Sequence, residues 1–415
     1  MTQKLHFGVY TLIFILLFLR FDWSRADSLY VVTAAGGHRQ IEVFDTTRDT
    51  AIEHRALEPR MMPIGDAVRL FSAVPPWVAD PSEETSDLRR RRKAGVKAVP
   101  VANYPEAITV AGRHLYGEVG DEEPGFLFEI PLSAAKHPKY YDTFQRHFTA
   151  IRAFNRRIFA SYLNAGIWWA GPTPGPAHKI DDRQVGNARF LLMRGGEFRP
   201  NASLRSYFNT NHVAAMNDCC TALAIVSGGK TLYAAGEDAD GRPALFIVDV
   251  ATARLTEIVS LETRSDASIA DLATASDGAV YSAVIANGGK TLSVYRFGGP
   301  DDRATTQSEI DLGSLSPDGE RPVLRLAFGG NRLFLSIGDR LIALDSNDPR
   351  KTVATMTLPR PPAAIVATGD GRKVYLDLNG IVPVRLTGDD KFAADPPLIL
   401  DGEPERIAVD AAAAR

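Results

Sequence analysis

The sequence has very few cysteines: two among 415 residues, and these are neighbours, Cys219 and Cys220. A chain of this size therefore cannot join distant segments by disulfides, and packing and strand pairing must hold it together. The sequence also lacks a Gly-x-Ser-x-Gly elbow, a His-Glu-x-x-His pair and a phosphate-binding glycine loop, so it indicates no catalytic residues. Lys and Arg number 47 against 50 Asp and Glu, which does not indicate a nucleic-acid-binding protein.

An apolar run long enough to span a membrane is missing as well. Residues 1–26 combine Lys4, a 13-residue mostly apolar run at 7–19, and the small residues Ser24 and Ala26. This pattern predicts a signal peptide cut after Ala26, and hence a periplasmic or extracellular protein. An uncleaved anchor is the alternative, but a spanning helix needs roughly 20 apolar residues. We therefore expect no stable membrane span after cleavage.

What the sequence does have is a repeated word, one aliphatic residue followed by one aromatic. Successive words are 41 to 53 residues apart, with one longer step of 74. A period of 40 to 50 residues with four strand-like runs predicts an all-β fold, a single β-propeller of four-stranded blades. The words are Leu29-Tyr30, Leu70-Phe71, Leu115-Tyr116, Ile158-Phe159, Leu232-Tyr233, Val280-Tyr281, Leu333-Phe334 and Val374-Tyr375.

The two ends of the mature chain, residues 27–415, complete one another. Residues 406–409 read as a first strand with nothing after it, and residues 29–56 read as three strands without a first. One blade is therefore predicted to close by pairing of the N- and C-terminal strands. Residues 58–105, with a strand predicted at 68–73, are a degenerate blade or an insertion. Seven blades are favoured, and eight remain open.

The repeats resemble those of exported propellers of the YVTN and quinoprotein amine dehydrogenase heavy-chain type. Ser28-Leu29-Tyr30-Val31-Val32 followed by residues 41–46 carries the resemblance, and residues 246–252 echo it. The resemblance extends over most of residues 28–410. It implies a fold and a compartment, and it carries over no catalytic residue.

Loop insertions in propellers tend to gather on one face, which is often the binding face. The candidates here are 77–96, a loop insertion at 168–187 between the second and third strands of its blade, and 236–242, together with the 209–220 segment between two blades. We expect a protein partner or a small-molecule ligand at this loop-rich face. The candidate contact residues are Asn209, Asn211, His212, Asn217, Asp218, Cys219, Cys220, Trp168 and Trp169.

No metal site is predicted from these residues. Cys219, Cys220 and His212 lack the usual zinc spacing. Residues 237–241 lack the length and the closing Glu of a calcium loop, so a hairpin turn is favoured. The basic run 89–93 follows acidic residues, so local charge compensation is favoured over an anionic partner.

Three functions remain open. The favoured one is an exported, non-catalytic propeller that binds a protein or a small ligand. The second is a quinoprotein-type oxidoreductase, because adjacent cysteines resemble the vicinal disulfide of quinoprotein alcohol dehydrogenases; the repeated blade motif of that family is missing, and the cofactor stays unknown. The third is a hydrolase at the central channel, for which only Asp271 and Glu106 stand near the start of an inner strand.

We predict that the exported protein starts at Asp27 and carries a Cys219–Cys220 disulfide. An oxidising compartment favours the bond, and the chain has no competing cysteine. The intact mass of alkylated, unreduced protein should therefore equal that of residues 27–415 without alkyl groups. A mass that includes Met1 would contradict cleavage, and two alkyl groups would contradict the disulfide.

Overall fold

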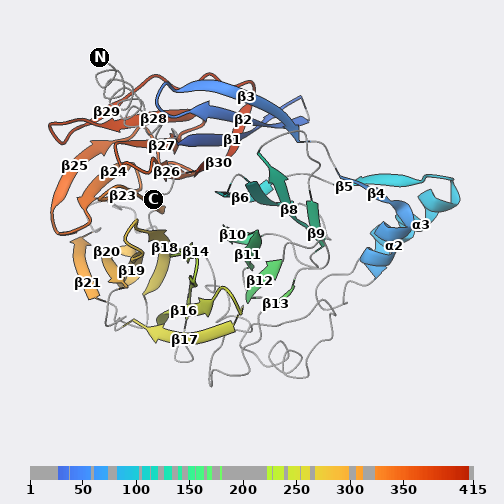
Figure 1. Ribbon diagram of the computed structural model, residues 1–415, viewed down its shortest axis with the longest axis horizontal. Helices are drawn as coiled ribbons and strands as arrows, with labels where there is room; N and C mark the ends of the chain where they lie inside the picture. The colour runs from blue at the N-terminus through green and yellow to red at the C-terminus, as the bar shows by residue number, and fades with distance from the viewer. Residues whose placement is uncertain are drawn as a thin grey trace, which may run out of the picture.

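The computed structural model describes most of residues 27–410. The larger gaps are 73–81, 120–125, 133–138, 143–147, 171–177, 180–221, 262–266, 299–304 and 312–322, with further gaps of one to four residues. The described part is built mainly of antiparallel strands in sheets around a common centre (Figure 1). The all-β propeller prediction is therefore confirmed.

Six four-stranded sheets each use four consecutive strands. Three of them are β6 (Pro105–Ala111), β7 (His114–Val119), β8 (Phe126–Pro131) and β9 (Lys139–Asp142); β10 (Phe148–Phe154), β11 (Arg157–Tyr162), β12 (Gly166–Ala170) and β13 (His178–Lys179); and β14 (Leu223–Ile225), β15 (Thr231–Glu237), β16 (Pro243–Asp249) and β17 (Arg254–Ser260). The other three are β18 (Ser268–Thr274), β19 (Val280–Ala286), β20 (Thr291–Phe297) and β21 (Thr305–Asp311), with the short η2 turn (Asn287–Gly289); β22 (Leu324–Gly329), β23 (Arg332–Ile337), β24 (Arg340–Asp345) and β25 (Thr352–Thr357); and β26 (Ile365–Ala367), β27 (Lys373–Asp377), β28 (Ile381–Leu386) and β29 (Phe392–Ala394).

A further four-stranded sheet joins the two ends of the described chain. Its strand order is β3-β2-β1-β30, with β1 at Ser28–Ala35, β2 at His38–Asp45, β3 at Thr50–Leu57 and β30 at Glu403–Asp410. Leu29 lies opposite Val409, and Val31 lies opposite Ile407. The predicted pairing of the terminal strands is confirmed.

The repeated word marks the second strand of these sheets. Its aromatic ring is buried in every described case, and the reason is packing between neighbouring sheets, because a large flat ring fills the space that two twisted sheets leave. These residues are Tyr30, Tyr116, Phe159, Tyr233, Tyr281, Phe334 and Tyr375, all at 6% exposure or less. The Tyr375 hydroxyl also donates a 2.7 Å hydrogen bond to Asp49 of the next sheet.

The word Leu70-Phe71 is the exception. The strand predicted at 68–73 is wrong, because this stretch lies in helix α2 (Ile64–Ser72). Ile64, Ala67 and Val68 are buried, and their spacing of three and four residues is that of a helix face rather than of a strand. The aliphatic–aromatic pair alone does not distinguish the 3.6-residue period of a helix from the two-residue period of a strand.

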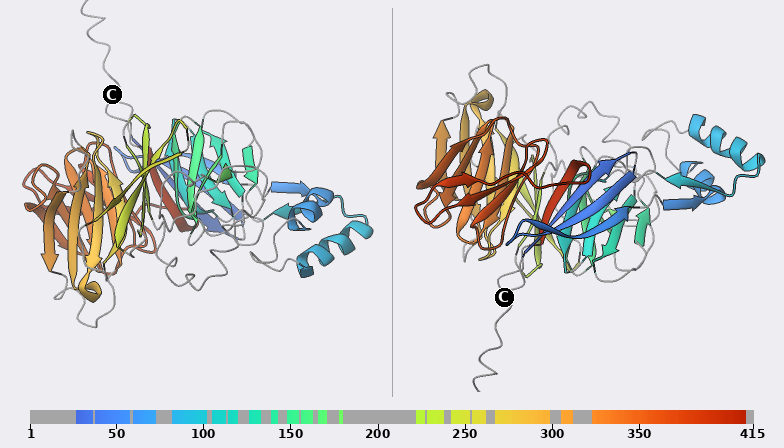
Figure 2. Two further views of the ribbon diagram at one scale, coloured as in Figure 1. Left: turned by 90° about the horizontal axis from the view of Figure 1, so that it is seen from below. Right: turned by 90° about the horizontal axis from the view of Figure 1, so that it is seen from above.

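Helix α2, helix α3 (Ser82–Lys93) and the two-stranded sheet of β4 (Arg60–Pro63) and β5 (Ala98–Val101) form a unit beside the propeller (Figures 1 and 2). In α3, Arg90 and Arg91 both pair with Asp87, so the basic run is partly compensated locally, as predicted. In the part of the chain that the structure describes, no helix is both long and apolar enough to cross a bilayer.

Strand order also decides which loops share a face. Neighbouring strands are antiparallel, so second-to-third connections leave the same end of a sheet as the connections that lead to the next sheet. The connection between β15 and β16 belongs to that end. The 209–220 segment lies outside the described residues. The α2/α3 unit belongs to that end too, because it follows β3, the fourth strand of its sheet.

The placement of the 168–187 insertion was wrong. Trp168 and Trp169 lie within β12, paired with Ala160 and Phe159 of β11. The connection that contains the Gly/Pro-rich stretch 171–176 joins β12 to β13, a third strand to a fourth, and the stretch itself lies outside the described residues. Residues 166–170 have the apolar pattern of a strand. The Gly/Pro run that follows them led to the prediction of a loop at this position.

We predict that deleting residues 403–415 unfolds the protein or makes it aggregate. The deletion removes β30, including Ile407, whose burial is worth roughly 1.5–3 kcal/mol, and several backbone hydrogen bonds of roughly 1 kcal/mol each. Together these approach the whole stability of a domain, about 5–15 kcal/mol. Thermal unfolding followed by circular dichroism is the measurement. Deletion of 411–415 is the matched control and should melt like the full chain; an unchanged, cooperative melt of the longer deletion would contradict the role of β30.

Candidate functional site

The candidate site is a central cavity of about 730 Å³. Residues from the innermost strand of each four-stranded sheet line it, namely β6, β10, β14, β18, β22, β26 and β30. These strands surround the centre of the molecule in Figure 1. Ligand sites in proteins are commonly such concave, shared spaces, where several elements can each contribute a polar group.

Three arginines, Arg152 on β10, Arg325 on β22 and Arg406 on β30, line this cavity. Each donates from Nη1 to the carbonyl oxygen of the residue before it, at 2.8, 2.9 and 2.5 Å in that order. Arg325 also donates from Nε to the Ala363 carbonyl at 3.1 Å. These bonds hold the guanidinium groups in place.

Asp271 on β18 lines the same cavity. Its carboxylate oxygens accept backbone hydrogen bonds from Leu272 and, across to the next sheet, from Leu326, both at 2.8 Å. Burial raises the pKa of Asp271, although these two bonds and the charges of Arg152 and Arg325 oppose the rise. Burial in turn lowers the pKa of Arg152, with Asp271 acting against the change.

Two further carboxylates line the cavity, and they differ in their surroundings. Glu405 forms a two-point ion pair with Arg39, at 2.7 and 2.8 Å, which neutralises it. Asp377 is buried, and burial raises its pKa against the lowering effect of backbone hydrogen bonds and of Arg360 and Arg406. The three lining arginines therefore share the cavity with two carboxyl groups whose pKa is raised by burial and with one carboxylate that is already paired.

Of the predicted contact residues, the structure describes only the backbone of Trp168 and Trp169. Asn209, Asn211, His212 and Asn217 to Cys220 lie outside the described residues, so their grouping stays a prediction. Trp168 and Trp169 are in β12, the third strand of its sheet. Asp271 does lie on an inner strand, as the sequence indicated, and Glu106 lies in the inner strand β6.

The arginines were missed, although the sequence carries a signal for two of them. Three inner strands share a charged residue, an aliphatic residue and alanine: Asp271-Leu272-Ala273, Arg325-Leu326-Ala327 and Arg406-Ile407-Ala408. Alignment of the repeats on their first strand would place these charges at one level of the cavity. The repeated aliphatic–aromatic pair lies on the second strand of each sheet, so it does not reveal this pattern on the first strands.

No family model matches the sequence, and no curated protein matches it by sequence. Solved structures do match. A "putative 6-phosphogluconolactonase" from Bacteroides uniformis is 13% identical with a TM-score of 0.56, and the match covers 92% of this chain and 99% of that one. A second protein so described, from Bacteroides fragilis, is 13% identical with a TM-score of 0.55, covering 94% and 99%.

A protein from Lactobacillus plantarum is similar to the same extent, at 9% identity and a TM-score of 0.56, with 92% of this chain and 99% of that chain covered. Identities this low show a shared fold and nothing finer. The propeller resemblance that the repeats indicated is thus confirmed at the level of the fold.

Proposed function

We propose that the protein is an exported, non-catalytic propeller that binds a small anionic ligand, carrying carboxylate or phosphate groups, in its central cavity. The single observation that carries the proposal is the set of three anchored arginines, Arg152, Arg325 and Arg406, around one space. Guanidinium groups bind carboxylates and phosphates through paired, charge-assisted hydrogen bonds. Groups that are held before the ligand arrives lose less entropy when it binds.

The proposal includes a closed ring of seven blades. It is supported by contacts between neighbouring inner strands: β30 contacts both β6 and β26, and the remaining inner strands contact one another in chain order. Closure packs every sheet between two neighbours, whereas an open arrangement would expose one face of each end sheet. Export is supported by the signal-like pattern of residues 1–26.

A second candidate, hydrolysis of a phosphorylated sugar lactone, has one observation in its favour. Asp271 combines a raised pKa with a place among arginines, and such a carboxyl group can exchange a proton with a reacting group. Two structurally similar proteins are described as 6-phosphogluconolactonases. Both oxygens of Asp271 already accept backbone hydrogen bonds, which favours binding over catalysis. The quinoprotein alternative rests on Cys219 and Cys220, and no described residue adds to it.

We predict that the protein binds 6-phosphogluconate, used as a probe anion, and that Arg152→Gln and Arg325→Gln each weaken binding. A hydrogen bond between charged groups is worth roughly 1.5–3 kcal/mol, so the loss should be about 10- to 100-fold. Isothermal titration calorimetry is the measurement. Arg372→Gln is the matched control, because this side chain is 85% exposed and does not line the cavity.

The same titration separates the two candidates when 6-phosphogluconolactone is added and the release of acid is followed. The binding proposal predicts no hydrolysis above the rate in buffer. Turnover that Asp271→Asn abolishes would establish the second candidate instead. Unchanged affinity in both cavity variants, or no binding of the probe at millimolar concentration, would remove the proposed site.

We predict that Asp271 makes the protein less stable as pH rises. Its folded pKa lies above the ordinary value of 3.8, so the folded state holds a proton that the unfolded state has already lost. The contribution of Asp271 to the free energy of unfolding is fully present below pH 3.8. It is lost as the pH rises through the pKa that Asp271 has in the folded state.

Chemical unfolding of the wild type and of Asp271→Asn between pH 4 and 7 tests this. The wild type should lose stability relative to the variant as pH rises. Asp339→Asn, in the exposed turn before β24, is the control and removes a carboxylate of the same kind from the surface. A pH-independent difference between the wild type and Asp271→Asn would contradict a raised pKa.

A further inference from the structure

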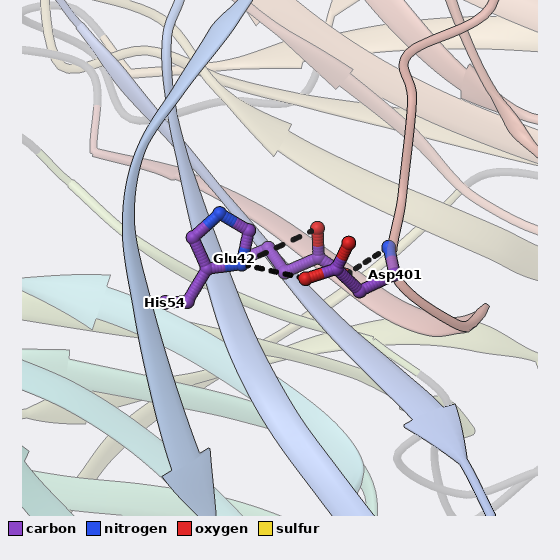
Figure 3. A group of neighbouring side chains, drawn as sticks. All are labelled: Glu42, His54 and Asp401. Carbon is purple, nitrogen blue, oxygen red and sulfur yellow. Dashed lines mark hydrogen bonds and ion pairs between the residues drawn. The ribbon is translucent and has the colours of Figure 1, made fainter.

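Three side chains converge at the joined terminal sheet, outside the cavity: Glu42, His54 and Asp401 (Figure 3). Glu42 on β2 and His54 on β3 are direct cross-strand partners. Asp401 lies in the connection that leads from β29 into β30. One ligand atom from each lies within 4.8 Å of the other two. Strands from the start of the chain and a turn near its end thus present an imidazole and two carboxylates to one point.

Glu42 is the unusual member because its side chain is fully buried, at 0% exposure. Its Oε1 accepts hydrogen bonds from the Thr33 hydroxyl at 2.6 Å and from the Asp401 amide at 3.1 Å. Its Oε2 is buried and has no hydrogen-bond partner among the described residues. Nδ1 of His54 lies 3.9 Å from Oε2, which is too long for a hydrogen bond. A buried carboxylate oxygen without a partner is unfavourable, and a bound cation is one group that satisfies it.

We propose that Glu42, His54 and Asp401 bind a zinc ion. A nitrogen and two carboxylate oxygens suit Zn²⁺, whereas Ca²⁺ and Mg²⁺ prefer oxygen ligands alone. With zinc–ligand distances near 2.1 Å, two ligand atoms of a tetrahedral site lie about 3.4 Å apart. Nδ1 of His54 is 3.1 Å from Asp401 Oδ2 and 3.9 Å from Glu42 Oε2, on either side of that value. His54 is 44% and Asp401 63% exposed, so the ion can enter from solvent and keep a water as its fourth ligand.

The position of this site gives it a structural role. Glu42 and His54 belong to strands from the N-terminal end, and Asp401 lies two residues before the start of β30. An ion bound by all three would link the two chain segments that pair through β1 and β30. Metal binding to the folded state alone adds to stability by mass action. Zinc should therefore raise the melting temperature and slow hydrogen exchange in β30.

The test is a zinc titration of untagged full-length protein, stripped with chelator, by isothermal titration calorimetry and thermal unfolding. The wild type should bind one zinc ion at this site. His54→Ala and Asp401→Asn should weaken binding at least tenfold and remove the rise in melting temperature. Both side chains are partly exposed, so both variants should melt like the wild type in chelator. His38→Ala removes an exposed histidine from β2 and should bind zinc normally.

A variant with Cys219→Ser and Cys220→Ser separates this site from zinc bound to thiols. It should keep the zinc ion and the rise in melting temperature. The proposal is overturned if the wild type binds no zinc, if His54→Ala binds it as tightly as the wild type, or if the double serine variant loses it.

Discussion

The antiparallel pairing of β1 with β30 is the interaction on which the rest of the structure depends. It draws residues more than 360 positions apart into one sheet, and side chains reinforce it: Arg39 on β2 reaches past β1 to Glu405 on β30, and Glu42 accepts a hydrogen bond from the Asp401 amide. Gly402 lies so close to β1 that an added Cβ would meet the Ala34 carbonyl oxygen at 2.5 Å. The backbones at this junction leave no room for a side chain.

The same strand contributes to the proposed ligand site. Arg406 follows Glu405 on β30, so the pairing that positions the strand also brings a third guanidinium to the cavity. Asp271 also links two sheets and lines the cavity, because its carboxylate accepts hydrogen bonds from backbone amides of both β18 and β22. In this molecule, contacts between blades and the polar lining of the axis are made by the same residues. Ligand affinity and stability are therefore expected to be coupled.

The fold was predictable because its signals are local. Each second strand carries an aliphatic–aromatic word followed by turn residues, and the missing strand at one end matched the extra strand at the other. Two errors had physical causes. Residues 64–72 are short and apolar enough to suit either period, and burial of Ile64, Ala67 and Val68 against α3 and β5 decides for a helix. Trp168 and Trp169 belong to a strand that ends where the Gly/Pro run begins.

The site was harder to predict because it is built from single residues on separate strands. Arg152, Arg325 and Arg406 are far apart in the sequence, and only the arrangement of the inner strands brings them together. A crystal structure of the protein with 6-phosphogluconate bound tests the central claim most directly. The account predicts the phosphate or carboxylate of the ligand on the propeller axis, within hydrogen-bond distance of Arg152, Arg325 or Arg406. A ligand bound at the 209–220 segment, with only water between the three arginines, would contradict it.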